Sequence, residues 1–69
     1  MKVRYDPSVD AAYISLLEEG ARADFGHTVA CAPQDVGGQI HMDFDTEGRL
    51  IGIEVLQASK KLPLKLLEK

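Results

Sequence analysis

Short stretches of the chain alternate apolar and polar residues, which is the period-two pattern of a β-strand with one buried and one solvated face. Val3 and Tyr5 alternate with charged residues, and Ile40, Met42 and Phe44 alternate with polar ones. The pattern predicts five strands, over residues 1–5, 11–17, 25–32, 39–44 and 49–56. A helix is the alternative for the second segment, but its central tyrosine and isoleucine favour a strand.

Turn-forming residues separate these segments. Asp6 and Pro7 break the first from the second, because proline removes a ladder donor and aspartate can bond the backbone two residues on. Further breaks are expected at residues 18–20, 33–38 and 45–48. Ser59 can cap the C-terminal segment, but Pro63 restricts the residue before it, so a short terminal helix is expected to start near Pro63.

The predicted elements make up one α+β domain over residues 1–69. We expect a small antiparallel β meander of four to five strands, with a short C-terminal helix that covers an edge or the apolar face. The predicted core consists of the inward-facing strand residues Val3, Tyr5, Ile14, Leu16, Ile40, Met42, Phe44, Ile51, Ile53 and Val55.

The last two strands can be placed in register from their apolar residues, because a shift by one residue would divide these between the two faces. The register that keeps all six on one face pairs Phe44 with Ile51, Met42 with Ile53 and Ile40 with Val55. It also sets His41 opposite Glu54, and Asp43 opposite Gly52. A glycine inside a strand weakens it unless something packs closely there. Gly52 therefore points to a packed side chain such as Tyr5 or Tyr13, or to a dimer contact.

Residues 43–54 have a second interpretation as a calcium-binding loop. The acidic and glycine residues that fall on loop positions one, three, five, six and twelve are Asp43, Asp45, Glu47, Gly48 and Glu54. Such a loop needs a helix on each side, whereas the flanking residues alternate with period two. The pattern favours a β-hairpin with a type I turn and Gly48 in the left-handed conformation.

Two motifs of the chain resemble those of a known family. The first is Tyr5-Asp6-Pro7 followed by Asp10-Ala11-Ala12-Tyr13-Ile14, and the second runs from Asp43 to Ser59. Together they resemble the small bacterial domain-of-unknown-function family numbered 2283, over nearly the whole chain. The resemblance implies a compact, mainly antiparallel β domain with a short terminal helix and no established activity. It also suggests an antitoxin-like, partner-binding role, because such genes sometimes neighbour small toxin-like genes. The motif residues expected to have structural roles are Asp6, Pro7, Asp10, Asp45, Gly48, Gly52, Glu54 and Ser59.

No arrangement of residues typical of catalysis stands out, since the chain has neither a nucleophile elbow nor a phosphate-binding glycine pattern. The predicted register gathers His41, Asp43 and Glu54 on the outer face of the sheet. These side chains could bind a divalent metal or a ligand, or do acid–base work. The simpler interpretation is a solvated face on which His41 and Glu54 form a cross-strand pair. We expect no catalytic residue and no cofactor.

Charge and cysteine content narrow the functional classes further. The net charge is −3, and residues 1–59 hold ten acidic against four basic residues, which argues against nucleic-acid binding. Residues 60–69 hold four lysines against one glutamate, a basic tail. Cys31 has no second cysteine to pair with, and we expect it to be a small, buried or half-buried apolar residue. No signal-like segment or run of about 20 apolar residues is present, so no membrane and a cytoplasmic location are expected.

The small size of the chain favours self-association. A domain of this length buries only about 60% of the surface that its unfolded chain exposes, and pairing adds burial. We therefore expect a homodimer. The sequence predicts a non-enzymatic protein-interaction module, with an antitoxin-like partner as one form that such a module could take. A small metal- or ligand-binding protein using His41, Asp43 and Glu54 is the alternative.

Overall fold

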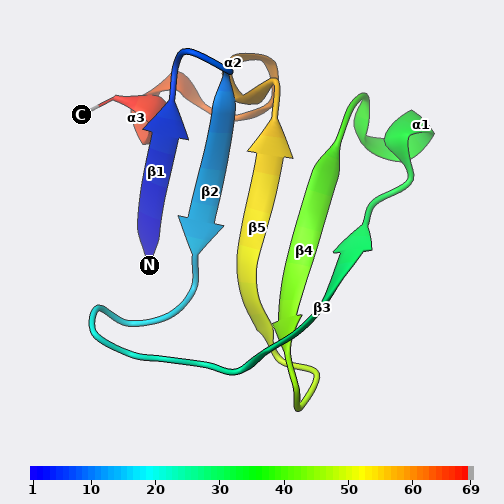
Figure 1. Ribbon diagram of the computed structural model, residues 1–69. Coiled ribbons are helices and arrows are strands. Elements are labelled where there is room, and N and C mark those ends of the chain that lie inside the picture. The colour runs from blue at the N-terminus through cyan, green and yellow to red at the C-terminus, as the bar shows by residue number, and fades with distance from the viewer. Residues whose placement is uncertain (69) are drawn as a thin grey trace.

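The computed structural model describes residues 1–68, and Lys69, a member of the basic tail, lies outside the described residues. Within that range five strands form one antiparallel sheet, and three short helices lie at one end of it (Figure 1). The elements in chain order are β1 (Lys2–Asp6), β2 (Ala11–Ser15), β3 (Phe25–Ala30), α1 (Pro33–Val36), β4 (Ile40–Asp45), β5 (Leu50–Leu56), α2 (Ala58–Lys61) and α3 (Leu64–Leu67). The predicted α+β class, antiparallel sheet and C-terminal helix are confirmed.

The strands lie in the order β1-β2-β5-β4-β3, so the sheet is not a simple meander. In a meander each strand pairs with the next along the chain, whereas here β2 pairs with β5. Residues 16–24 carry the chain past the end of the sheet to its far edge, where β3 lies (Figure 1). Strands β4 and β5 then return toward β2, which leaves β1 and β3 as the edge strands.

The β4–β5 hairpin follows the predicted register over most of its length. The predicted pairs that form are Ile40–Val55, His41–Glu54, Met42–Ile53 and Asp43–Gly52. The predicted Phe44–Ile51 pair is wrong, because the register shifts between Asp43 and Phe44 and sets Phe44 opposite Leu50. Such a bulge adds one residue to one strand, and a strict period of two does not anticipate it.

Asp45 and Gly48 build the turn of this hairpin. Asp45 Oδ1 accepts hydrogen bonds from the backbone N–H groups of Glu47 (2.9 Å) and Arg49 (2.8 Å). Gly48 has a φ of 82°, which glycine adopts without steric cost. Strands rather than helices flank the turn. The hairpin interpretation is confirmed, and the calcium-loop interpretation, which needs two helices, is wrong.

Several local boundaries differ from those predicted. The expected loop at residues 33–38 contains α1, which begins at Pro33 and is closed by Gly37 in the left-handed conformation (φ 67°). Proline at the start and glycine at the end suit a helix of one turn. Strands β2 and β3 each end two residues earlier than predicted, at Ser15 and Ala30.

The C-terminal segment is more helical than predicted. Helix α3 begins directly after Pro63, as expected, but α2 precedes it. Ser59 lies inside α2, whose N-cap position is held by Gln57, so the predicted capping role of Ser59 is wrong. Cys31 is half-buried, as predicted.

The apolar face of the sheet is covered only at one end, by α2 and α3. The buried core there consists of Ala12, Val55 and Ala58. The partly buried side chains that pack against it are Tyr5, Ile40, Ile53, Leu62 and Leu67. In Figure 1 both helices lie at the end of the sheet that holds the β1–β2 turn.

Beside this covered end, one apolar residue from each strand forms a continuous row across the sheet. Val3 pairs with Ile14, Ile14 with Ile53, Ile53 with Met42, and Met42 with Val29. We call these five residues the apolar row. None of them is buried: four are half-buried, and Val29 on the edge strand is 40% exposed.

The predicted core is thus confirmed only in part. Of its members Val55 alone is buried, and Leu16 is 39% exposed. The members that are half-buried are Val3, Tyr5, Ile14, Ile40, Met42, Phe44, Ile51 and Ile53. Ala12 and Ala58 were missed, because a small side chain carries little weight in a hydrophobic pattern.

Asp10 joins the β1–β2 turn to α2. Its carboxylate accepts hydrogen bonds from the Ser59 hydroxyl (2.7 Å), the Ser59 backbone N–H (3.0 Å) and the Tyr5 hydroxyl (2.7 Å). These bonds, with the Ser59 hydroxyl contributing most, lower the pKa of Asp10. The Asp10 carbonyl also accepts from the N–H of Ala58 (2.9 Å). Asp10 therefore holds the helical cover on the apolar end of the sheet.

Replacing Asp10 with asparagine should destabilise the fold in a pH-dependent way. Asparagine tolerates the left-handed backbone at this position (φ 51°), so the change mainly removes the negative charge. Because folding lowers the pKa of Asp10, its contribution is complete above the unfolded pKa of about 3.9 and is lost as the pH falls through the folded value. The difference in unfolding free energy between wild type and Asp10→Asn should therefore be constant from neutral pH to about pH 5 and shrink below pH 4.

Urea unfolding over a pH series, at one protein concentration, measures this difference. Ser59→Ala removes a hydrogen-bond donor to the same carboxylate. The loss of unfolding free energy that it causes should also shrink below about pH 4. A cost of Asp10→Asn that does not change with pH would contradict the role given to the carboxylate.

Candidate functional site

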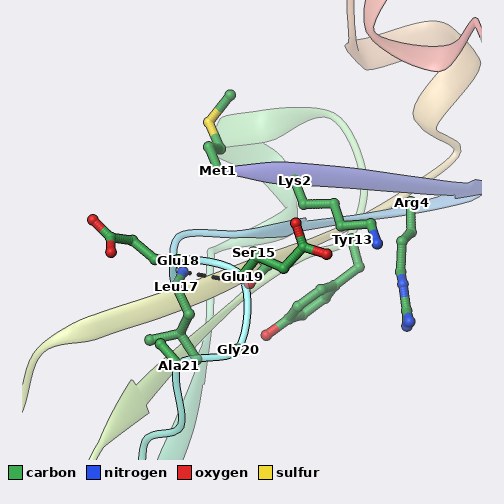
Figure 2. A pocket seen from close by; sticks show the side chains of 10 residues that line it. All are labelled: Met1, Lys2, Arg4, Tyr13, Ser15, Leu17, Glu18, Glu19, Gly20 and Ala21. Carbon is green, nitrogen blue, oxygen red and sulfur yellow. Dashed lines mark hydrogen bonds between the residues drawn. The ribbon is translucent and has the colours of Figure 1, made fainter.

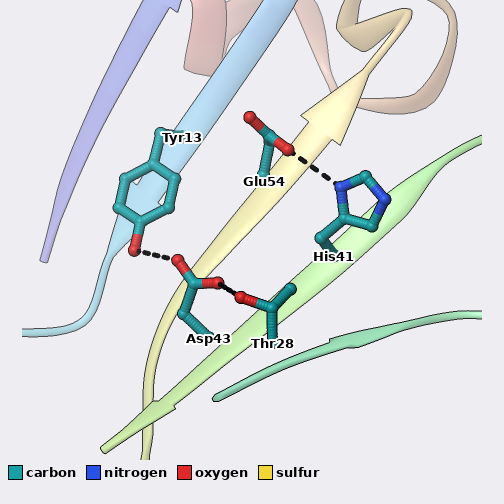
Figure 3. Close-up of polar contacts among 5 residues, drawn as sticks. All are labelled: Tyr13, Thr28, His41, Asp43 and Glu54. Carbon is teal, nitrogen blue, oxygen red and sulfur yellow. Dashed lines mark hydrogen bonds and ion pairs between the residues drawn. The ribbon is translucent and has the colours of Figure 1, made fainter. Parts of the chain in front are cut away.

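A hydrogen-bonded network on the polar face links side chains from three strands (Figure 3). Tyr13 on β2 donates its hydroxyl proton to Asp43 Oδ2 on β4 (2.9 Å). Thr28 on β3 donates to Asp43 Oδ1 (2.7 Å). Strand β5 lies between β2 and β4, so the Tyr13 side chain crosses over β5 to reach Asp43.

Gly52 on β5 makes room for this crossing. It is buried and lies opposite Asp43, and a Cβ atom at this position would collide with the hydroxyl group and ring of Tyr13. The prediction that a tyrosine such as Tyr13 packs on Gly52 is therefore confirmed. Tyr5, the other candidate, instead donates its hydroxyl proton to Asp10.

The network keeps Tyr13 neutral. Burial raises the pKa of the Tyr13 phenol, and the hydrogen bond to Asp43 and the negative charges of Asp43 and Glu54 raise it further. Tyr13 is therefore a proton donor near neutral pH, and both oxygens of Asp43 are occupied as acceptors. Within residues 1–68 no buried side-chain nitrogen or oxygen lacks a hydrogen-bond partner. The arrangement ties β2, β3 and β4 together across the polar face.

His41 and Glu54 form a separate pair on the same face. His41 Nδ1 lies 2.8 Å from Glu54 Oε1, in the predicted cross-strand position. Asp43, the third predicted candidate, is directed to Tyr13 and Thr28 instead (Figure 3). Among the described residues no three His, Cys, Asp or Glu side chains converge in a way that could hold a metal ion. The three candidates are thus divided between two hydrogen-bonded groups.

The Asp6-Pro7 motif closes the turn after β1. Asp6 Oδ1 accepts hydrogen bonds from the Ser8 hydroxyl (2.6 Å) and the Ser8 backbone N–H (3.0 Å). This local bonding is the turn geometry that aspartate favours two residues ahead of a backbone donor. Asp6 and Pro7 therefore lead the chain into the contact between Asp10 and Ser59.

A groove of about 630 Å³ lies on the polar face beside β1 and β2 (Figure 2). Lys2, Arg4 and Tyr13 line it from the strands, and Glu18 and Glu19 line it from the following loop. The two cations are matched by two carboxylates, so the groove has little net charge with which to select an ionic ligand. The Tyr13 hydroxyl is already bonded to Asp43.

The apolar row is the stronger candidate surface. It crosses all five strands and carries no charged side chain, and α2 and α3 cover it only in part: Ile53 packs against the buried core, whereas Val29 on the edge strand is 40% exposed. Alternation in the sequence identified four of its members, but as core residues. The signal that distinguishes surface from core is the length of the covering segment, since two helices of four residues each cannot span a sheet of five strands.

The fold defines a small α+β protein built on a single antiparallel sheet. The chain belongs to the family described as "Protein of unknown function (DUF2283)", whose model matches residues 2–59. The matched range includes all five strands and both partners of the Asp10–Ser59 contact, and it leaves α3 outside. No curated protein and no solved structure gives a match. In the described part of the chain, no helix has the length and apolar character to cross a membrane.

Replacing Gly52 with alanine should destabilise the fold by about 1–3 kcal/mol, because the new Cβ atom displaces the Tyr13 ring. In a Tyr13→Ala background the collision is gone, and the same change should be neutral or stabilise the fold by up to about 1 kcal/mol, because glycine inside a strand is less favourable than alanine. Urea unfolding of the four proteins in a double-mutant cycle measures the coupling. Gly48→Ala is the matched control, since its cost comes from a positive φ and should not depend on Tyr13. Equal costs of Gly52→Ala in both backgrounds would contradict the contact.

The chain has two tyrosines, and both should ionise above the usual tyrosine pKa of about 10. Asp43→Asn removes the negative charge beside Tyr13 and should lower the pKa of Tyr13 alone. Asp10→Asn should lower the pKa of Tyr5 alone, because the hydrogen bond to Asp10 is the main cause of its raised value. Tyrosinate absorbance during an alkaline titration measures both groups. An unchanged titration in Asp43→Asn would contradict the assigned network.

Proposed function

We propose that this chain is a non-enzymatic protein-interaction module whose binding surface is the apolar row. The apolar face is incompletely covered, and this observation carries the proposal. Each strand contributes one apolar side chain to the row, and none of the five is buried. A contiguous exposed apolar patch on a folded protein marks an interaction site more often than a scattered set of apolar residues does.

The polar face supports a role without catalysis. Catalytic groups are typically gathered in a cleft and poised to exchange protons with a substrate. Here each oxygen of Asp43 accepts a hydrogen bond, from Tyr13 and from Thr28, and His41 is paired with Glu54. A metal or ligand site built from His41, Asp43 and Glu54 receives no support from this geometry, because the three side chains do not converge.

A protein is the partner that the surface chemistry favours. The net charge of −3 opposes binding to nucleic acid, and an uncharged apolar row suits a protein surface of the same character. An antitoxin-like role, which rests on the family resemblance, would use the same surface to hold a small toxin. We also propose a cytoplasmic setting, which the unpaired Cys31 supports.

Two neighbouring residues on β3 offer a matched test of this surface. Val29 belongs to the apolar row, and Ala30 is exposed on the opposite face of the same strand. Wild-type and Ala30→Lys proteins, immobilised as baits, should retain the same proteins from a lysate of the source cell. Val29→Lys should retain each of them at least about tenfold less, since a buried lysine in an apolar contact costs more than about 1.4 kcal/mol.

Quantitative mass spectrometry of the retained proteins, endogenous copies of the chain included, gives the result. Far-UV circular dichroism of the three baits tests whether each is folded. Equal retention by wild type and Val29→Lys would contradict the proposal. A loss confined to Ala30→Lys would move the binding surface to the polar face.

A further inference from the structure

We propose that a second copy of this chain covers the apolar row, in a face-to-face dimer whose two sheets have antiparallel strand directions. This inference rests on the proposed function and names the partner at that surface. The area left open, the distribution of charge and the position of the helices support it independently.

The chain exposes more solvent-accessible surface than a compact monomer of its mass. It exposes 5090 Å², whereas a folded monomer of 7.6 kDa is expected to expose about 4300 Å². The excess of about 800 Å² equals the area that one partner buries in an interface of standard size. The radius of gyration is 12.4 Å, against about 11 Å for a compact domain of this length. The excess over the whole chain is therefore of the size that one half of a stable dimer buries.

The distribution of charge permits two copies to meet through this face. Each chain carries a net charge of −3, so copies that met through charged surfaces would repel each other. The charged side chains of the strands, such as Arg4, Asp43 and Glu54, lie on the opposite face, in alternation with the apolar row. A two-fold contact places each patch against itself, and an uncharged patch meets this condition without like charges facing each other.

The helices select the relative direction of the two sheets. Helices α2 and α3 stand on the apolar side at one end of the sheet (Figure 1). A helix is about 10 Å across, which matches the spacing of about 10 Å between packed sheets. With antiparallel strands, the helices of each copy lie against the open end of the other sheet. With parallel strands, both sets of helices would meet at the same end and hold the sheets apart.

This direction also covers apolar side chains that one chain leaves exposed. Leu64 and Leu66 on α3 are 66% and 40% exposed. Leu16, which follows Ile14 in the alternation of β2, is 39% exposed at the opposite end of the sheet. In the antiparallel dimer, α3 of one copy faces the Leu16 end of the other, so the row and both ends are buried together.

Val29 provides a test of both the surface and the direction. The two-fold axis of this dimer runs along the apolar row, so Val29 of one copy lies near Val29 of the other. Sedimentation equilibrium of the purified wild-type chain at micromolar concentration should give twice the chain mass of 7.6 kDa. Val29→Lys and Val29→Glu should each sediment at half that mass, because like charges then face each other across the axis. An equimolar mixture of the two variants should return to the dimer mass.

Ala30→Lys and Ala30→Glu are the matched controls, since they add the same charges to the same strand on the other face, and both should remain dimers. A monomeric wild-type chain would overturn the dimer, and the lysate experiment would then tell whether the row binds a different protein. A dimeric Val29→Lys would overturn the assigned face, and a mixture that stays monomeric would overturn the assigned direction. If either variant unfolds alone, the mixture still decides: recovery of circular dichroism together with dimer mass supports the proposal, and no recovery overturns it.

Discussion

A single sheet has two faces, and in this chain only the short C-terminal segment with α2 and α3 packs over one of them. On the polar face, β5 is covered at Gly52 by the Tyr13 side chain, which bonds to Asp43. The apolar face depends on α2 and α3, which reach only one end of it. The contact between Asp10 and Ser59 fixes that cover in position. The buried core is accordingly small, and the unfilled part of the apolar face becomes the principal feature of the surface.

The fold was largely predictable because each strand shows a local alternation of apolar and polar residues. Alternation identified all five strands, and the requirement that apolar residues share a face gave four correct pairs in the β4–β5 hairpin. The bulge at Ile51, opposite the step from Asp43 to Phe44, was not predictable, since one extra residue leaves the local alternation intact on either side of it. The strand order was not predictable either. A connection over residues 16–24 can end beside β2 or at the far edge, and the packing of the whole sheet decides between them.

The candidate site illustrates the same limit. The pairing of His41 with Glu54 followed from the register of two neighbouring strands, and the sequence therefore predicted it correctly. Of the two partners of Asp43, Thr28 comes from β3, which a meander already sets beside β4, whereas Tyr13 comes from β2, and the sequence did not reveal that β2 lies within reach of β4. Only the glycine at position 52 signalled that a large side chain passes over this strand. A site made from residues of non-neighbouring strands requires the strand order, and so its chemistry could not be assigned before the fold.

The two faces of the sheet are coupled through the register of β2 and β5. Tyr13 alternates with Ala12 and Ile14, so the contact that sets Tyr13 over Gly52 also sets Ile14 beside Ile53 on the apolar side. If β2 slipped by one residue against β5, Tyr13 would turn toward the apolar face and Ile14 would leave it, which would interrupt the row. Gly52, Tyr13 and Asp43 thus together fix the register of β2 against β5. They thereby keep the apolar row continuous across all five strands, on the face that they do not themselves touch.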